Sequence, residues 1–233
     1  MTKLSGAERA ETVQAMFTRI AHRYDLMNRL MTAGQDIRWR REVMRRANVP
    51  PDGLVLDLGA GTGDLAREAL WQYPTCRPVA ADFTLEMMRV GRKTADLPGL
   101  DWSAADAGRL PFRDGTFDAV VSGFLLRNVV DLRQSLSEQY RVLKHGGRIV
   151  TLDTTPPPPT PLAPLIRFHL HTIIPALGHM ITGQADAYHY LPDSTESFLE
   201  PEQLAARLAA VGFRAAGFKR LMFGTIAIHW GQK

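Results

Sequence analysis

The chain has 233 residues, of which 45% are hydrophobic and 22% are charged, and its formal net charge is +4. This composition is typical of a globular protein and excludes a disordered, collagen-like or repetitive chain. A single cysteine, Cys76, excludes an intramolecular disulfide and a cysteine-rich metal site.

The apolar segments of the chain predict where in the cell the protein is located. The first twenty residues contain no continuous apolar core of a secretory signal. The most apolar stretch, residues 161–181, is interrupted by arginine, histidine and proline. A membrane span needs about 20 nearly unbroken apolar residues, so we expect none here. These observations predict a cytoplasmic protein.

The first part of the chain alternates between helical and strand patterns. Helical spacing of apolar residues predicts helices over residues 11–31, 36–47, 64–71, 84–93 and 131–143. Short apolar runs predict strands over residues 54–58, 78–82, 100–105, 117–122 and 148–153. His145, Gly146 and Gly147 are expected to stop the last of these helices.

A proline-rich connector, residues 154–161, separates this part from a less regular one. Short helices are expected at 161–171 and 175–181, a longer helix at 201–211, and two closing strands at 213–220 and 223–230. The chain therefore predicts an α/β fold with a doubly wound, mostly parallel seven-stranded sheet and an antiparallel C-terminal hairpin. Ligands of such sheets bind beyond the carboxyl ends of the strands.

A glycine-rich loop follows the first predicted strand and opens a helix. Gly59, Gly61 and Gly63 alternate in it, which allows the backbone to approach a ligand closely. A dinucleotide fingerprint needs glycine where Asp64 stands, and a Walker loop needs Gly-Lys-Ser/Thr. S-adenosylmethionine (SAM) carries no phosphate and is positively charged, so Asp57 and Asp64 favour it as the cofactor.

Further candidates end the next strands. Asp82 lies about 20 residues beyond the loop, where an acid accepts both ribose hydroxyls, although it also suits the cap of the helix at Thr84. Asp106 and Ala107 suit the adenine edge, but an aspartate in a turn is the ordinary alternative. Ser122 would meet the methionine part of the cofactor, or be a buried, hydrogen-bonded hydroxyl.

Four stretches of the chain resemble a known family. Residues 55–64 resemble motif I of class I SAM-dependent methyltransferases. Residues 16–28, 125–129 with 140–147, and 186–191 resemble the ubiquinone/menaquinone C-methyltransferases (the UbiE/MenG family). The resemblance extends from about residue 11 to the end of the chain and implies the Rossmann-like class I methyltransferase fold.

By this resemblance, Thr62, Asp82, Asp106, Ala107 and Ser122 match SAM contacts of the family, together with the loop glycines Gly59 and Gly61. Arg127, Asn128 and Tyr24 match positions near the quinone ring, as the catalytic candidates. Two departures stand out: Ala60 replaces a loop glycine, and Leu125 takes the place of a glycine next to the expected acceptor site.

The implied reaction is methyl transfer to a ring carbon of a polyprenyl quinol, from demethylmenaquinol to menaquinol, from a ubiquinol-precursor benzoquinol, or both. Arg127 stays protonated, so we expect it to stabilise the phenolate rather than to act as a base. A structural salt bridge is its alternative role. Asn128 and Tyr24 would position a water molecule or the hydroxyl.

The resemblance also suggests roles for whole segments of a single domain, residues 1–233. Residues 1–47 would form a helical lid, 48–153 the SAM-binding core, 154–200 an acceptor-binding helical insertion, and 201–233 a closing helix and hairpin. The apolar segment 162–181 would form a groove for the isoprenoid tail, a patch on the inner face of the membrane, or ordinary core. The arginine-rich helix over residues 38–46 is interpreted as a solvated charged face.

Other interpretations remain open at this point. The chain is a methyltransferase for another phenolic molecule or for RNA, or a non-catalytic SAM-binding protein. We expect no nucleic acid partner, because no RNA-binding module accompanies the motifs. We expect no metal either, since the spacing of His169, His171, His179 and His189 fits no zinc motif. A homodimer is expected only by analogy with the family.

Overall fold

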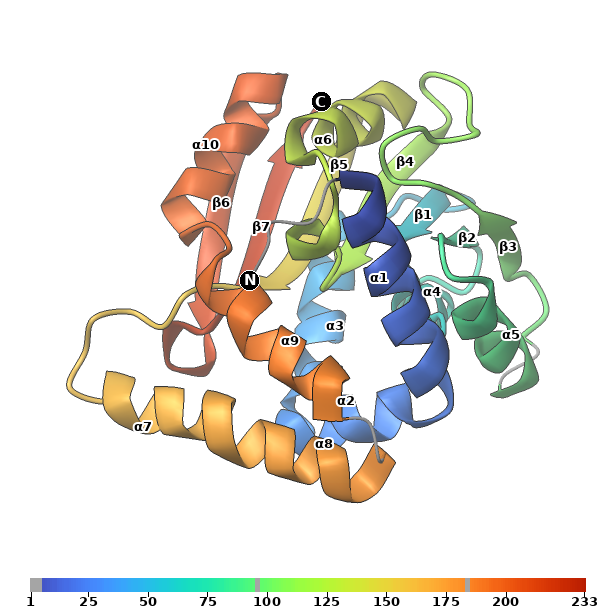
Figure 1. Cartoon of the computed structure of the whole chain (residues 1–233). Coiled ribbons are helices and arrows are strands. Elements are labelled where there is room, and N and C mark those ends of the chain that lie inside the picture. The colour runs from blue at the N-terminus through green and yellow to red at the C-terminus, as the bar shows by residue number, and fades with distance from the viewer. Residues whose placement is uncertain (1–5, 95–96, 183–184) are drawn as a thin grey trace.

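The computed structural model describes residues 6–94, 97–182 and 185–233, so residues 1–5 of the predicted lid lie outside the described residues. A seven-stranded sheet with the order β3-β2-β1-β4-β5-β7-β6 runs through these residues (Figure 1). Its strands are β1 (Leu54–Leu58), β2 (Arg77–Asp82), β3 (Asp101–Ala104), β4 (Phe117–Gly123), β5 (Leu143–Thr154), β6 (Arg214–Leu221) and β7 (Ile226–Gln232).

The order of the strands confirms the predicted fold. Strands β1 to β5 pair in parallel, whereas β7 pairs antiparallel with both β5 and β6. The chain winds outward from β1 to β3 and then returns to place β4 on the other side of β1. This reversal is the topological switch point, and the carboxyl ends of β1 and β4 are therefore the expected place for a ligand.

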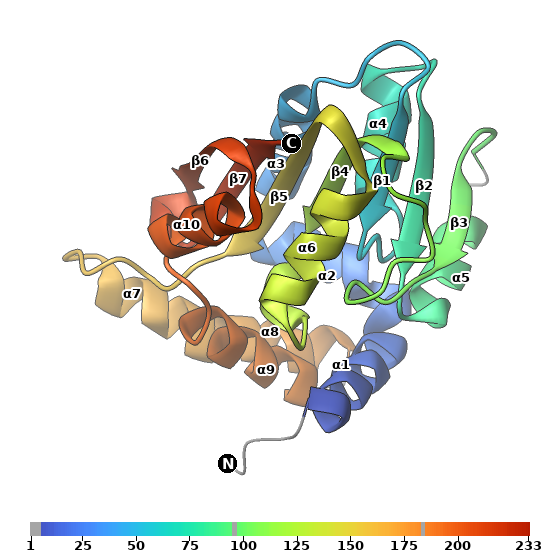
Figure 2. The ribbon, with the colours of Figure 1, turned by 90° about the horizontal axis from the view of Figure 1, so that it is seen from above.

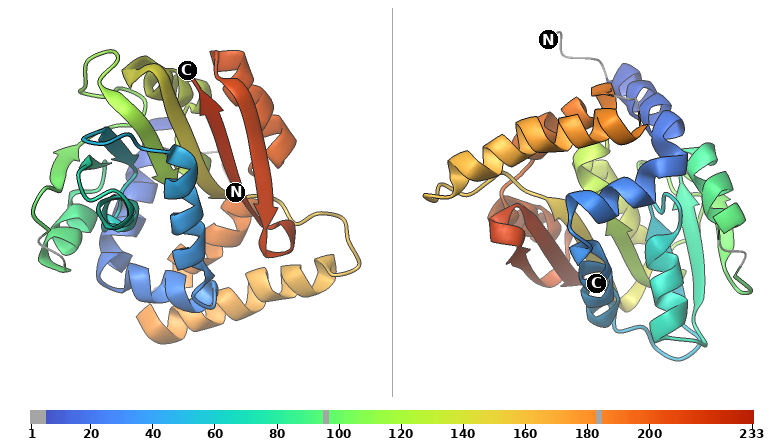
Figure 3. Two further views of the ribbon diagram at one scale, coloured as in Figure 1. Left: turned by 180° about the vertical axis from the view of Figure 1, so that it is seen from behind. Right: turned by 90° about the horizontal axis from the view of Figure 1, so that it is seen from below.

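Helices cover both faces of the sheet (Figures 2 and 3). On one face α3 (Gln35–Ala47) and α4 (Asp64–Gln72) bury a core that includes Val55 and Val150. On the other, α6 (Leu132–Val142) and α10 (Pro201–Val211) bury a core that includes Leu56 and Ile149. Neighbouring residues of one strand thus enter opposite cores, which explains why the parallel strands are apolar throughout. Helix α5 (Leu85–Thr94) follows β2.

A group of helices lies along one end of the sheet (Figure 1). It comprises α1 (Gly6–Ile20), α2 (Tyr24–Met31), α7 (Ala163–Phe168), α8 (Ile174–Thr182) and α9 (Ala185–Glu196). A small core of its own includes Met16, Ile20, Met27 and Ile174, so segments from both ends of the chain pack together here. We call this group the helical cover. No helix among the described residues has the length and apolar character to cross a membrane.

Several predicted boundaries are wrong, and each has a local cause. The helix expected over residues 11–31 breaks at a 3-10 turn, Ala21–Arg23, where Ala21 is buried against Met87 of α5. The helices expected at 161–171 and 175–181 form one run, because a π-helical turn, His169–Ile173, joins α7 to α8. Helix α9 was not predicted, since its polar residues and internal Pro192 obscure the pattern.

The junction between α6 and β5 also differs from the prediction. The helix ends at Val142, and the strand begins at once with Leu143 rather than at residue 148. The glycines expected to stop the helix lie inside β5, where the pairing with β4 shifts register between Phe117 and Ala119. This irregular pairing tolerates glycine, which a regular strand disfavours.

Candidate active site

The carboxyl ends of the central strands surround a cavity of about 230 Å³, which we call the strand-end cavity. Helix α1 covers it with Val13, Gln14 and Phe17. Most of the predicted site residues line it, although they come from distant parts of the chain: Tyr24, Gly59, Gly61, Asp82, Asp106, Ala107 and Asn128.

The glycine loop approaches this cavity in a conformation that favours glycine. Gly59 has φ 67° and Gly61 has φ 57°, both in the left-handed region. A Cβ atom on Gly59 would lie 2.8 Å from Cδ1 of Leu125. Leu125, which stands where the family usually has glycine, lines the strand-end cavity and packs against Gly59, where no Cβ atom is present. It is thus a neighbour of the cofactor loop.

Asp82 has the capping role that its position suggested, and it also lines the strand-end cavity. Its Oδ1 atom accepts a hydrogen bond from the Thr84 backbone N–H at 2.6 Å, and its Oδ2 atom accepts one from the Gly61 N–H at 2.8 Å. The carboxylate therefore caps the turn after β2, braces the glycine loop and lines the cavity. Burial raises the pKa of Asp82, while the backbone N–H donors oppose the shift.

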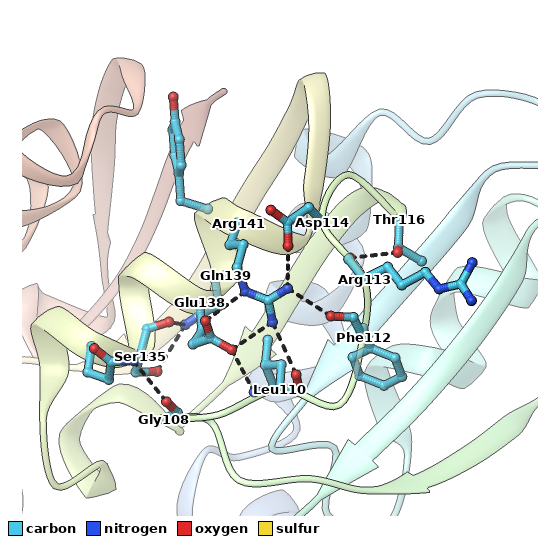
Figure 4. Close-up of polar contacts among 12 residues, drawn as sticks. Gly108, Leu110, Phe112, Arg113, Asp114, Thr116, Ser135, Glu138, Gln139 and Arg141 are labelled. Carbon is cyan, nitrogen blue, oxygen red and sulfur yellow. Dashed lines mark hydrogen bonds and ion pairs between the residues drawn. The ribbon is translucent and has the colours of Figure 1, made fainter.

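The loop that carries Asp106 and Ala107 is anchored to α6 (Figure 4). The Arg141 guanidinium donates to the carbonyl oxygens of Leu110 and Phe112 at 3.1 and 2.8 Å, and Glu138 accepts from the Leu110 N–H at 2.7 Å. The Asp106 side chain is exposed and accepts from the Gly108 N–H at 2.8 Å, as an aspartate in a turn does.

Thr62 and Ser122 lie apart from the strand-end cavity. The Thr62 hydroxyl donates to Asp25 Oδ1 at 2.7 Å and thereby ties the glycine loop to α2. The Ser122 hydroxyl is buried inside the sheet and donates to Thr151 Oγ1 of β5 at 3.0 Å. Its neighbour Gly123 lines the cavity instead.

Three acids and a buried arginine lie beneath the glycine loop. Asp57 is 1% exposed and accepts from the Ala66 N–H at 2.9 Å; burial raises its pKa to about 7, with help from Asp64 and Asp82. Arg40 is paired with Asp36 and, at 2.8 Å, with Asp64. The negative charge of Asp64 is therefore balanced by Arg40. Asp64 is thus weaker evidence against a phosphate-bearing ligand than its sequence position suggested.

Arg40 corrects the interpretation of its helix. The sequence pattern placed it on a solvated charged face, but Arg40 and its neighbour Trp39 are buried. The four-residue spacing between Asp36 and Arg40, which favours an ion pair on a helix, was the available signal.

Arg127 and Asn128 belong to a 3-10 turn, Leu126–Asn128, after β4. Arg127 is 7% exposed, and its Nη1 atom lies 2.5 Å from Asp153 Oδ1, so the salt bridge exists. Its Nε atom has no hydrogen-bond partner. Asn128 donates to the Phe124 carbonyl at 2.9 Å and accepts from the Tyr190 hydroxyl at 3.0 Å, so its amide is engaged within the protein.

Two further cavities lie under the helical cover. The larger, about 430 Å³, we call the apolar cavity; it is lined by residues of the 162–174 segment, including Leu162, Leu165 and Leu170, and by Arg127. A small chamber of about 40 Å³ shares Phe17 and Tyr24 with the strand-end cavity and shares Asn28, Arg127, Met31 and Leu191 with the apolar cavity. The chamber thus lies between the other two.

Tyr24 and Asn28 face this chamber from one side of α2, four residues apart. Burial raises the pKa of the Tyr24 hydroxyl, an effect that Asn28 and the charge of Arg127 oppose. The sequence analysis did not single out Asn28, although it ends the stretch 16–28 that carries the resemblance. Among the described residues, no three His, Cys, Asp or Glu side chains gather as metal ligands would.

Solved structures of SAM-dependent methyltransferases have the same fold. A SAM-dependent methyltransferase of Thermotoga maritima superposes with a TM-score of 0.65 at 18% identity, covering 94% of this chain and 98% of that one. One from Methanococcus maripaludis gives 0.66 at 19% identity, with 93% of both chains covered. The fold is that of the class I methyltransferases.

Sequence relatives narrow the class to a family. The pattern of the ubiE/COQ5 methyltransferase family matches residues 3–233. A Desulfotalea psychrophila protein named ubiquinone/menaquinone biosynthesis C-methyltransferase UbiE is 48% identical over 95% of this chain and 90% of its own. A Thermus thermophilus demethylmenaquinone methyltransferase is 44% identical over 94% of this chain and 100% of its own. This chain belongs to the ubiE/COQ5 methyltransferase family and is a SAM-dependent methyltransferase.

Proposed function

We propose that this enzyme transfers the methyl group of SAM to a ring carbon of a polyprenyl quinol, converting demethylmenaquinol to menaquinol, a ubiquinol-precursor benzoquinol to its methylated form, or both. The names of its relatives support this substrate class. One observation carries the proposal: the strand-end cavity, the small chamber and the apolar cavity follow one another and share lining residues.

The strand-end residues fit SAM. Asp82 offers a carboxylate to the ribose hydroxyls, and the braced Asp106–Ala107 turn borders the same cavity. Among the described residues that line the cavity there are carboxylates but no arginine or lysine to neutralise a phosphate, which suits a cationic ligand. We propose Gly59, Gly61, Thr62, Asp82, Asp106, Ala107 and Ser122 as the residues around SAM, with Thr62 and Ser122 acting from beneath the loop and the strand end.

When bound, SAM supplies an electrophilic methyl group on a positively charged sulfur. Arg127 stabilises the phenolate that forms when the quinol hydroxyl loses its proton. Asn128 holds Phe124, whose φ of 59° is unusual for a residue with a side chain and whose ring borders the strand-end and apolar cavities. Tyr24, which lines both the cavity and the chamber, orients the ring hydroxyl. Helices α1 and α2 exclude water from the reacting atoms.

The apolar cavity suits the isoprenoid tail, because its lining is dominated by aliphatic side chains. We also propose that the surface beside it contacts the membrane. Leu165 and Phe168 of α7, Met180 of α8 and Phe223 near the hairpin turn are between 57% and 76% exposed. A tail could then enter directly from the lipid. A homodimer remains a prediction.

A direct assay tests the proposed reaction. Purified enzyme and SAM are incubated with demethylmenaquinol, with a demethylated benzoquinol and with total RNA, and the products are weighed by mass spectrometry. We expect one added methyl group on a quinol and none on RNA. Methylated RNA, or SAM binding without methylation of any quinol, would contradict the proposal.

Flotation with vesicles tests the membrane contact. We expect Phe168→Asp and Met180→Asp to reduce binding to vesicles of phosphatidylcholine and phosphatidylglycerol. Trp71→Asp is the matched control, because Trp71 is comparably exposed, at 69%, but belongs to α4, which packs on a face of the sheet and is not part of the helical cover. Equal losses in all three variants would count against a specific membrane face.

A further inference from the structure

Two buried hydrogen-bond donors face the small chamber without a partner. Among the described residues, four buried side-chain polar atoms lack a hydrogen bond: Asn28 Nδ2, Arg127 Nε, Gln139 Oε1 and His229 Nδ1. Asn28 and Arg127 are each 7% exposed, and both line the chamber and the apolar cavity. Gln139 and His229 line neither. The unpaired donors therefore gather at one place.

Such an arrangement is costly without a ligand. A buried N–H group that finds no acceptor loses its hydrogen bonds to water, and native proteins rarely leave one unpaired. Neither atom carries a lone pair for accepting a hydrogen bond, so the missing partner must be an acceptor. The Tyr24 hydroxyl lies close enough to Asn28 for their contact to oppose the rise of the Tyr24 pKa, but among the described residues Asn28 Nδ2 has no partner at normal hydrogen-bond geometry.

Three other groups of Arg127 are already occupied. Its Nη1 atom and its backbone N–H both bond to Asp153, at 2.5 and 3.2 Å, and its carbonyl oxygen accepts from Arg9 at 2.9 Å. The guanidinium is thus held in place, with its Nε–H edge left for a ligand. The backbone of Asn28 is held as well, because the hydroxyl of Thr32, the residue after α2, donates to the Asn28 carbonyl at 2.8 Å.

The sizes of the cavities indicate what binds there. A chamber of about 40 Å³ has room for an oxygen atom and the carbon that bears it, but not for a ring. The adjoining apolar cavity of about 430 Å³ has room for the ring and part of a tail. Met31, which lines both, has a flexible side chain that can adjust to the ring.

We propose that Asn28 Nδ2 and Arg127 Nε together bind one ring oxygen of the acceptor, the oxygen next to the carbon that receives the methyl group, and stabilise it as an anion. The inference rests on the proposed function and adds Asn28 as a catalytic residue. The ring hydroxyl loses its proton to water, and its electrons increase the charge on the neighbouring carbon. That carbon forms a bond to the methyl group as the bond from methyl to sulfur breaks. The ring carbon then loses its hydrogen as a proton and the ring oxygen takes one proton back from water, so that quinol and SAM give methylquinol, S-adenosylhomocysteine and one proton.

A coloured naphthol measures the donor pair without methyl transfer. The absorption of 4-nitro-1-naphthol reports its ionisation, so its pKa can be measured free and bound to the enzyme. We expect binding to wild-type enzyme to lower this pKa by about one unit, equivalent to a tenfold preference for the anion. Asn28→Asp and Asn28→Ala should abolish most of the shift, since both remove the amide donor. Asn48→Asp is the matched control, because Asn48 is exposed at the end of α3.

Kinetics with the quinol give the second measurement. We expect both Asn28 variants to lower kcat about tenfold, to shift the acidic limb of the pH profile to higher pH, and to leave the melting temperature and SAM affinity nearly unchanged. A bound-naphthol pKa that is the same in wild type and both variants, or no binding of the naphthol to wild type, would overturn the inference.

The two proposals fail in different ways. If the naphthol pKa is shifted in the wild type but not in Asn28→Asp, and no quinol is methylated, then the donor pair is supported and the proposed substrate is rejected. Quinol methylation that is insensitive to both Asn28 substitutions keeps the substrate and rejects the donor pair.

Discussion

The strand-end cavity and the chamber under the helical cover differ in how their polar groups are satisfied. Around the glycine loop, Asp82, Asp106 and Thr62 all have partners within the protein. In the chamber, the Asn28 and Arg127 donors have none, although both side chains are buried. The first region is therefore organised by the protein alone, whereas the second is completed only by an acceptor molecule.

This difference matches the elements that build the two regions. The residues proposed to bind the cofactor follow strands of one rigid sheet, whose register positions them before any ligand binds. The chamber is assembled from α1, α2, the 3-10 turn after β4, and α9, which meet through side-chain contacts rather than through a sheet. A contact surface of this kind can open for a bulky acceptor more easily than a sheet can.

The largest effect is expected where the two regions meet, at the salt bridge between Arg127 and Asp153. Arg127→Leu leaves the 1% exposed Asp153 carboxylate without its cation, which should lower the free energy of unfolding by about 3–5 kcal/mol. Urea unfolding measures this loss. The double variant Arg127→Leu/Asp153→Leu should recover part of the stability but no methyl transfer. Recovered activity in the double variant would show that Arg127 serves only as a structural ion.

A smaller effect should separate the two acids of the strand-end cavity. Asp82→Ala removes the acceptor for both the Gly61 and the Thr84 N–H groups, and with it the brace of the loop. At about 1.5–3 kcal/mol for each of these two bonds, SAM affinity should fall by about 100-fold or more. Asp106→Ala loses one exposed bond to Gly108, so calorimetry should find a loss of about tenfold. Equal losses would contradict the different anchoring of the two residues.

The smallest effect concerns pH and the buried Asp57. Its pKa is about 7 in the folded protein because of burial, against 3.8 ordinarily, so between about pH 4 and 7 the folded state holds a proton that the unfolded state has lost. Asp57 therefore makes the protein less stable as the pH rises through this range. Melting temperatures of Asp57→Asn should decline less between pH 5 and 8 than those of the wild type. The same decline in both proteins would show that Asp57 keeps an ordinary pKa.

Bound SAM should lower the pKa of Asp57, whereas burial raises it. A cation bound beside the loop favours the charged form of Asp57, so SAM affinity should increase from pH 6 to 8 in the wild type and change less in Asp57→Asn. Titrations in buffers of different ionisation enthalpy would detect the released proton.

The features that could be predicted from the sequence are those whose residues lie close together in the chain. The glycine loop and Asp82 were found because a strand, a turn and a helix follow each other within a few residues and end at one edge of the sheet. The edge hairpin was found for the same reason, from two adjacent strands. Helix α9 was missed because its polar surface and Pro192 weaken the local pattern, while its stability comes from packing on α1 and α8.

The sequence by itself determined the class of fold and the glycine-rich loop, because these depend on periodicity and short-range spacing, and the resemblance of several stretches indicated the family. Only the tertiary structure decided that Ser122 bonds to Thr151, that Arg40 is buried between two acids, and that Asn28 and Arg127 face one chamber with free donors. In each case at least one partner is distant in the chain or absent from it, as Asp64 is distant from Arg40. Whether a polar side chain is satisfied by its own protein or left for a ligand depends on what packs against it, which local sequence does not specify.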